Sequence, residues 1–189
     1  MKIVNLIENT CHKEGLQCEH GLSFYVETPK HKILMDSGAD DKFLHNAEKL
    51  NVDLRAVDVA VLSHGHYDHC GGVMAFSWLN PAAAVYLRVG ADGEFYHVES
   101  DYTQYIGIDK EILQLPQLQQ AQGNLTIDDE LFIFGDVKAE GCLPRGNRCL
   151  KVRNQAGEYA ADDQQRQIQN QGRGQFHCVA SLLLLIRVL

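Results

Sequence analysis

Apolar and polar residues alternate in several short stretches of the first half of the chain. In residues 22–28 the side chains of Leu22, Phe24 and Val26 fall on one side, the period-two pattern of a strand with one buried face. Residues 57–62 are apolar almost throughout, which predicts a strand that is buried on both faces. The other strands predicted in this half are 2–8, 32–36 and 83–88, of which 32–36 is the hairpin partner of 22–28.

Two segments between these strands have helical spacing instead. The apolar residues of 43–50 recur at intervals of three and four, and Asp40 or Asp41 can cap the start of that helix. Residues 71–80 predict a second short helix, which Pro81 ends. Strands that alternate with helices indicate an α/β layered fold with a covered sheet.

Beyond residue 90 the pattern is weaker. It predicts one helical turn at 110–115 and short strands at 94–98, 124–127, 130–137 and 149–152. Residues 154–175 are polar and rich in glutamine with little periodicity, a composition typical of linkers or disordered segments. The apolar run that follows, 179–186, is far too short to cross a bilayer.

Composition restricts the classes of function. The chain has 189 residues, of which 45% are hydrophobic, enough for one substantial core and most simply a single domain. Its formal net charge of -8 argues against a nucleic-acid or anionic-membrane partner. The six cysteines form no C-x-x-C pair and the N-terminus has no export signal, so we expect free thiols in a reducing cytoplasm. The sequence does not determine the oligomeric state.

Residues 63–72, SHGHYDHCGG, concentrate candidate metal ligands directly after the most apolar strand. Alternate residues of an extended segment share a face, so His64 and His66 can point at one cation. Asp68 and His69 follow in the turn and can serve a second cation beside the first. Imidazole and carboxylate ligands suit Zn²⁺ best, with Fe and Mn as alternatives. The pattern therefore predicts a divalent-metal site, and its glycines allow the tight backbone that such convergence requires.

This stretch resembles the H-x-H-x-D-H motif of the metallo-β-lactamase superfamily. Residues 21–38, which end in Asp36-Ser37-Gly38, resemble the hairpin that precedes the motif in that superfamily. Residues 1–152 are most similar to a branch that includes the dihydropterin-methyl-ribofuranosylaminobenzene phosphate synthase of methanopterin biosynthesis. The resemblance implies an αββα sandwich and a metal-dependent hydrolase acting on a small molecule, phosphorylated or pterin-related. A transferase of pterin biosynthesis is the alternative activity.

The resemblance also implies roles for the motif residues. His64 and His66 would bind the first metal ion, and Asp68 and His69 would bind the second. Asp68 would in addition be the catalytic residue, orienting the nucleophile and later carrying a proton.

For three further residues the sequence supports a role near the site and also a plainer alternative. Asp36 would lie behind the ligands and orient their loop, although an ordinary turn residue explains it equally well. Glu19 and His20 would contact the substrate, against the alternative of a surface loop. Cys70 is interpreted as a small buried residue. The remaining histidines considered, interpreted as surface or packing residues, are His12, His31, His45 and His97.

The second half departs from the family pattern, in which a third histidine, a bridging aspartate and a final histidine complete the metal pair. Here only His177 follows residue 152, and Asp162 and Asp163 precede it in the wrong order. We therefore predict a metallo-β-lactamase-like domain over 1–153 and an atypical tail over 154–189. A truncation or a reading-frame error would explain this tail. A naturally minimal variant is the alternative. We then expect His177 to lie too far from the first metal site to complete it. We also expect part of the sheet to be uncovered. The alternative function is that of an inactive metal-binding module.

Overall fold

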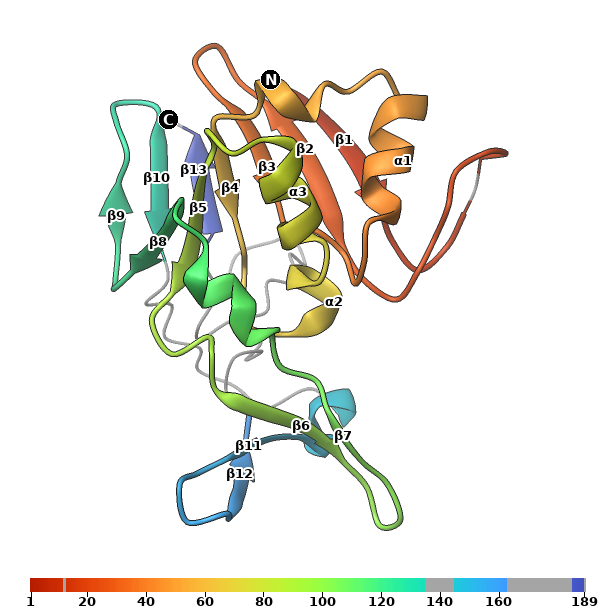
Figure 1. Ribbon diagram of the computed structural model, residues 1–189, viewed down its shortest axis with the longest axis vertical. Helices are drawn as coiled ribbons and strands as arrows, with labels where there is room; N and C mark the ends of the chain where they lie inside the picture. The colour runs from red at the N-terminus through yellow and green to blue at the C-terminus, as the bar shows by residue number, and fades with distance from the viewer. Residues whose placement is uncertain (12, 135–144, 163–184, 189) are drawn as a thin grey trace, which may run out of the picture.

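The computed structural model describes residues 1–11, 13–134, 145–162 and 185–188. Its largest element is a six-stranded sheet with the strand order β1-β2-β3-β4-β5-β8 (Figure 1). The pairs β1–β2 and β2–β3 are antiparallel, whereas the pairs β3–β4, β4–β5 and β5–β8 are parallel. The strands of this sheet are β1 (Lys2–Ile7), β2 (Ser23–Glu27), β3 (Lys32–Met35), β4 (Val59–Val61), β5 (Ala84–Arg88) and β8 (Leu118–Ala121). All but β8 were predicted from the pattern of apolar and polar residues.

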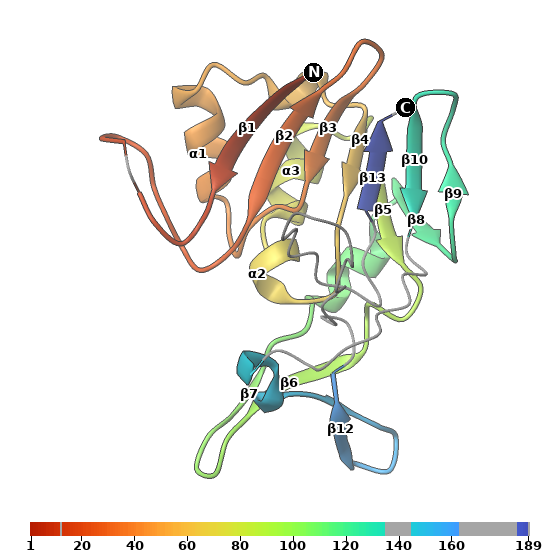
Figure 2. The ribbon, with the colours of Figure 1, turned by 180° about the vertical axis from the view of Figure 1, so that it is seen from behind.

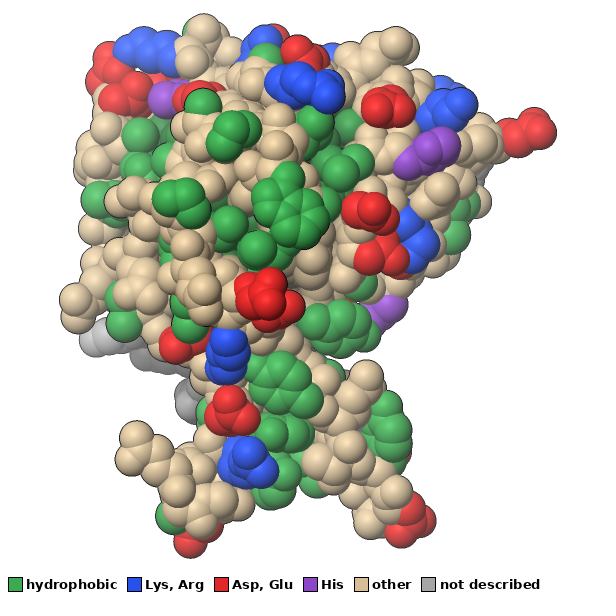
Figure 3. Space-filling model, viewed as in Figure 1, with side chains coloured by type: hydrophobic (Ala, Val, Ile, Leu, Met, Phe, Trp, Pro, Cys, Tyr) green, Lys and Arg blue, Asp and Glu red, His purple; other side chains and the backbone are tan. Residues whose placement is uncertain are grey.

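Helices α1 (Lys42–Lys49) and α3 (Val73–Leu79) cover one face of the sheet (Figures 1 and 2). Leu34, Ala60 and Val85 of the sheet pack there with Phe43 of α1 and Phe76 of α3, and all five are at most 1% exposed. The two helices predicted at 43–50 and 71–80 are therefore confirmed, and their apolar stripes face the sheet. Apolar side chains also reach the surface over this helical face (Figure 3).

The opposite face of the sheet packs against a second, three-stranded sheet with the order β13-β10-β9. Its strands are β9 (Leu125–Thr126), β10 (Leu131–Phe134) and β13 (Leu185–Val188). Ile33, Val59 and Val61 form one buried cluster with Leu131 and Ile133 of β10. The part of the sheet that was expected to be uncovered does not include β3 and β4, because β10 packs over their outward-facing side chains.

A third sheet, β12-β11-β6-β7, extends beyond the carboxyl ends of the central strands (Figure 1). Its strands are β6 (Glu94–Val98), β7 (Thr103–Tyr105), β11 (Leu150–Arg153) and β12 (Tyr159–Ala161). The prediction of a linker from residue 154 onward is wrong over 154–161, since β11 and β12 form an antiparallel hairpin there. Its turn is closed by the Asn154 N–H, which donates to Glu158 O at 2.9 Å, and Gly157 adopts φ 84°. The rest of the expected linker lies outside the described residues, and the division at residue 153 stays a prediction.

Short elements with weak sequence signals complete the fold. β8 has the sequence LQQA, and it is a strand because it pairs with β5 and not because its residues favour one. The helical turn predicted at 110–115 is a 3-10 helix, Lys110–Gln114, and two more such turns are Leu54–Ala56 and Arg145–Cys149. Within the described ranges, no helix is long and apolar enough to cross a membrane.

Candidate metal centre

The predicted ligands gather where β3 and β4 end. Asp36 directly follows β3, and Ser63 and His64 follow β4. The two strands run parallel, so their carboxyl ends meet at one edge of the sheet, where open α/β sheets usually carry their sites. Helix α2 (Tyr67–Cys70) lies just beyond these strand ends (Figures 1 and 2) and begins directly after His66.

The three histidines of the motif pack against one another. The ring centroid of His64 lies 4.7 Å from that of His66 and 4.2 Å from that of His69. His64 and His66 are each 3% exposed. The side chain of His69 is 16% exposed. The convergence of these side chains follows from the spacing of the motif, and a group of three imidazoles is a donor set that fits a borderline divalent cation.

Glycine allows the backbone of the motif to pass close to other segments. A Cβ atom on Gly65 would lie 1.7 Å from the carbonyl oxygen of Ala91, and one on Gly71 would lie 2.0 Å from that of Ala39. Both neighbours are backbone atoms, which cannot rotate away as the end of a flexible side chain can. The ligand loop therefore has its shape because these positions lack a side chain.

Asp36 lies behind the histidines and is 2% exposed. Its Oδ1 accepts a hydrogen bond from the Ser63 N–H at 2.6 Å. Its Oδ2 accepts from the Ser63 hydroxyl and pairs with His69 Nδ1, each at 2.7 Å. Asp36 itself has a positive φ of 56°, a conformation that aspartate tolerates better than most residues. The carboxylate thus contacts both ends of the ligand loop.

These hydrogen bonds determine which nitrogen of each ring carries a proton. An ionised Asp36 only accepts, so the Ser63 hydroxyl must donate to it, and Ser63 Oγ is then the acceptor for His64 Nδ1 at 2.9 Å. By the same reasoning, His69 donates from Nδ1 to Asp36. When these two rings are neutral, Nε2 of each carries the lone pair, which is the state that a metal ligand requires.

Burial and charge act differently on the two rings. Burial lowers the pKa of His64 well below its usual value, and the neighbouring His69 and His66 lower it further. Burial would also lower the pKa of His69, but the charges of Asp36 and Asp68 and the hydrogen bond to Asp36 outweigh it, so the pKa is raised. His64 is therefore neutral, while His69 is the ring whose positive charge the carboxylates stabilise.

Asp162 belongs to this cluster, which corrects its rejection on the basis of sequence order. Its Oδ2 lies 2.7 Å from His66 Nε2, and its side chain is 1% exposed. The hairpin of β11 and β12 leads the chain back to the site, where the Asp162 N–H donates to Leu150 O at 3.1 Å. The order of residues along the chain was a poor criterion, because strand pairing and not sequence order decides which residues meet.

Asp68 lies on the open side of the cluster. Its Oδ2 is 3.5 Å from His69 Nε2 and 3.5 Å from His20 Nε2. The side chain of His20 is 72% exposed, and its Nδ1 lies 3.3 Å from Asn9 Oδ1. His20 therefore lies beside Asp68, and its contact with a substrate stays a prediction.

Glu19 faces another way. Its Oε1 accepts hydrogen bonds from the N–H groups of Ala39 and Asp40 at 2.8 and 3.3 Å, and its Oε2 pairs with Lys42 at 2.9 Å. The carboxylate connects the loop before β2 to the start of α1. These bonds give Glu19 a structural role. The contact of Glu19 with a substrate stays a prediction.

The other residues considered in the sequence are also located. Cys70 is buried, and its thiol donates to His64 O at 3.0 Å; burial, followed by the charges of Asp36 and Asp68, raises its pKa well above the usual value. His31 lies between Asp58 and Asp128. His97 lies beside Glu99 and Cys149, both of them ligand-type residues. His12, Asp163 and His177 lie outside the described residues.

Two residues of the centre were missed or rejected in the sequence. Ser63 was not considered, although a hydroxyl directly before a ligand histidine is a signal that could have identified it. Asp162 was considered and rejected. A pair of acidic residues after a short apolar stretch was its only sequence signal.

Comparisons with known proteins agree with this geometry. An uncharacterized protein of Methanocaldococcus jannaschii, MJ0448, is 30% identical over 139 residues, 71% of this chain and 53% of its own length. The 7,8-dihydropterin-6-methyl-4-(β-D-ribofuranosyl)-aminobenzene-5'-phosphate synthase of the same organism is 34% identical over 79 residues, 39% of this chain and 27% of its own. The chain thus spans about half of these curated relatives or less.

A solved structure matches over nearly the whole chain. The crystal structure of Tm1679, described as a metal-dependent hydrolase of the β-lactamase superfamily, is 27% identical with a TM-score of 0.72 and covers 98% of this chain and 60% of its own. The family model of the metallo-β-lactamase superfamily matches residues 16–147, which contain the whole histidine motif. The chain has the α/β fold of these proteins and belongs to the metallo-β-lactamase superfamily.

Proposed function

We propose that this chain is a metal-dependent hydrolase in which water activated by divalent cations attacks a small-molecule substrate. The observation that carries the proposal is the cluster of three imidazoles, two buried and one partly exposed, with Asp162 on one side, Asp68 on the other and Asp36 behind. Members of the superfamily bind divalent metals, typically zinc. Nitrogen and carboxylate donors fit that metal, with Fe or Mn as alternatives.

The ligands divide between two positions. His64 and His66 are the proposed ligands of the first ion, and Asp68 and His69 those of the second. Asp162 joins His66 at the first position, where it adds a buried carboxylate to two imidazoles. The Nε2 lone pairs of His64 and His69 support this assignment because Asp36 and Ser63 occupy the Nδ1 side of both rings.

When bound, such cations lower the pKa of a coordinated water toward neutrality and polarise the substrate oxygen. The residues of the chain supply the positioning. Asp36 and Ser63 hold the imidazoles in one tautomer and one orientation. Asp68, with 13% of its side chain exposed, is the proposed catalytic residue that orients the nucleophile and accepts its proton. His20 is the proposed substrate contact, because it is exposed directly beside Asp68.

The substrate class rests on the relatives. A small molecule that is phosphorylated or pterin-related is proposed, since one relative is a dihydropterin phosphate synthase. The same similarity favours a second candidate function, transfer in pterin biosynthesis, which would use the same centre. The cytoplasm stays the predicted location.

The metal assignment is tested by elemental analysis of the purified chain, of His66→Ala and of Asp162→Asn. We expect both variants to lose most of the zinc, iron or manganese that the parent carries, while Glu158→Gln on the same hairpin keeps it. Unchanged metal content in His66→Ala would overturn the assignment.

The activity is tested with a chromogenic phosphodiester and a chromogenic carboxylic ester as probes. Hydrolysis that depends on bound metal and is lost in Asp68→Asn supports the hydrolase. Full metal content with no turnover of either probe or of a dihydropterin substrate would instead identify a metal-binding module without activity.

A further inference from the structure

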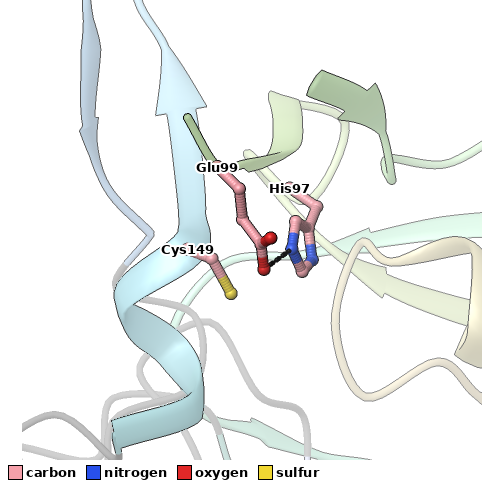
Figure 4. Close-up of side chains that lie close together, drawn as sticks. All are labelled: His97, Glu99 and Cys149. Atoms are coloured by element: carbon pink, nitrogen blue, oxygen red, sulfur yellow. Dashed lines mark hydrogen bonds and ion pairs between the residues drawn. The ribbon is translucent and has the colours of Figure 1, made fainter. Parts of the chain in front are cut away.

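We propose a second metal site, separate from the centre above, formed by His97, Glu99 and Cys149. One ligand atom from each of these side chains lies within 4.8 Å of the other two. Figure 4 shows the three side chains turned toward one another, with the Glu99 carboxylate beside the imidazole of His97. The site would take a borderline cation of the Zn²⁺ class, because it combines a thiol, an imidazole and a carboxylate.

Two pieces of secondary structure bring these residues together. His97 lies in β6 and Glu99 directly follows that strand, so the two are alternate residues and share a side. Cys149 is the last residue of the 3-10 helix Arg145–Cys149, and the next residue, Leu150, pairs with His97 in the sheet. Strand pairing thus fixes the cysteine next to the other two ligands.

The local contacts already hold the ligands in place. His97 Nε2 lies 3.0 Å from Glu99 Oε1, and the His97 ring packs at 5.8 Å against that of Tyr102. The Glu99 N–H donates to Tyr102 O at 2.8 Å, which closes the turn between β6 and β7. The Cys149 thiol donates to Gly146 O at 3.0 Å. The imidazole and the carboxylate are therefore already paired, and the thiol has a hydrogen-bond partner of its own.

The spacing suits a tetrahedral ion with small side-chain rotations. Zinc bond lengths of 2.0–2.3 Å put neighbouring ligand atoms about 3.3–3.8 Å apart. The imidazole and the carboxylate, 3.0 Å apart, would separate slightly to reach this spacing, and the thiol lies within the 4.8 Å limit. Binding replaces the thiol proton by the metal, so one proton leaves to solvent. With three protein ligands the fourth position is left for water or a small ligand.

A metal ion here would act on β11, the strand whose first residue accepts a hydrogen bond from the Asp162 backbone. Cys149 directly precedes β11, and Leu150 O accepts the hydrogen bond from the Asp162 N–H at 3.1 Å. An ion that joins Cys149 to β6 would restrain this contact. The site itself shares no residue with the main centre, so it can exist whether or not the main centre functions as proposed.

The thiol gives the site its own spectroscopic signature. The full chain is loaded with Co²⁺ alone, and the near-ultraviolet thiolate-to-cobalt charge-transfer absorption is measured. None of the proposed ligands of the main centre is a cysteine, so this band reports the second site. We expect the band in the parent and in His66→Ala, its loss in Cys149→Ser, and its weakening in His97→Gln.

Matched controls use the remaining cysteines, each replaced by serine in turn, and these variants should keep the band. Thermal unfolding is the second readout: added Zn²⁺ should raise the Tm of His66→Ala, and this rise should vanish when Cys149→Ser is added. No band in the parent, or a band that survives Cys149→Ser, would overturn the proposal and leave His97 and Glu99 as an ordinary surface ion pair.

Discussion

At the scale of single residues, Asp36 organises the metal centre although it is not one of its proposed ligands. It accepts hydrogen bonds from the Ser63 N–H, the Ser63 hydroxyl and His69 Nδ1. The Ser63 hydroxyl oxygen in turn accepts from His64 Nδ1, so Asp36 also influences the orientation of that ring. Both oxygens of the carboxylate are needed as acceptors. The equal alternative of a plain turn residue therefore explains only its backbone conformation and not its side chain.

The substitution Asp36→Asn tests this role. Asparagine has nearly the same size and also tolerates positive φ, so the backbone should keep its shape. In either amide orientation, however, the new NH₂ group faces a donor, the Ser63 N–H or the Ser63 hydroxyl and His69. We expect the affinity for Zn²⁺ to fall by about 10–100-fold, measured by competition with a chromophoric chelator.

The exposed Asp101→Asn is the control for the loss of one negative charge and should bind as the parent does. Parent-like affinity in Asp36→Asn would mean that the orientation of His69 and His64 does not depend on this carboxylate.

At the scale of elements, the segment from the end of β4 to Gly71, just after α2, lies close to the backbone of Ala39 and of Ala91. This close approach is possible because its glycines lack a side chain. A Cβ atom on Gly71 would lie 2.0 Å from Ala39 O and 2.8 Å from Tyr67 O. A Cβ atom on Gly146, in the 3-10 helix before β11, would meet nothing within 4 Å. The two positions therefore form a matched pair.

We expect Gly71→Ala to reduce the free energy of unfolding by about 1–3 kcal/mol, because overpacking against backbone forces the loop to shift. Gly146→Ala should leave it nearly unchanged. Urea unfolding followed by circular dichroism measures both. Equal stability of the two variants would show that the loop tolerates the added methyl group, contrary to the contacts above.

At the scale of the whole molecule, His31 connects the two packed sheets. It lies in the turn between β2 and β3, with Nδ1 2.5 Å from Asp58 Oδ2 before β4 and Nε2 3.0 Å from Asp128 Oδ2 before β10. Burial lowers the pKa of His31, but the hydrogen bonds and charges of Asp58 and Asp128 outweigh it and raise the pKa above 6.5. Hydrogen bonds from the N–H groups of Glu130 and Leu131 lower the pKa of Asp128 to about 2, so Asp128 stays ionised near neutrality.

The stability of the chain should therefore depend on pH through His31. A folded pKa above the unfolded value means that its contribution is complete below pH 6.5 and is lost as the pH rises through the folded pKa. We expect His31→Gln to remove this part of the profile, so that the parent and the variant differ most below pH 6.5 and least at alkaline pH. Urea midpoints across that range measure it, and two parallel profiles would contradict the assignment.

Local pattern determined much of this protein. The strands at 2–8, 22–28, 32–36, 57–62 and 83–88 and the helices at 43–50 and 71–80 follow from the local pattern of apolar and polar residues, because burial of one or both faces selects the same positions in any fold that covers a sheet. The ligand motif also follows from the sequence, since His64, His66, Asp68 and His69 lie within six positions after one strand. Close spacing along the chain forces such side chains to be neighbours in space.

Contacts between distant segments were decided by the tertiary structure alone. Asp162 reaches His66, and Cys149 reaches His97, through strand pairs whose partners lie far apart in the sequence. Ile133 and Val61 share one buried cluster, and His31 pairs with Asp128, through the packing of one sheet on another. Periodicity reports which side of an element is buried but not what buries it. The partner is selected by the free energy of the whole packed arrangement, which no short window of sequence contains.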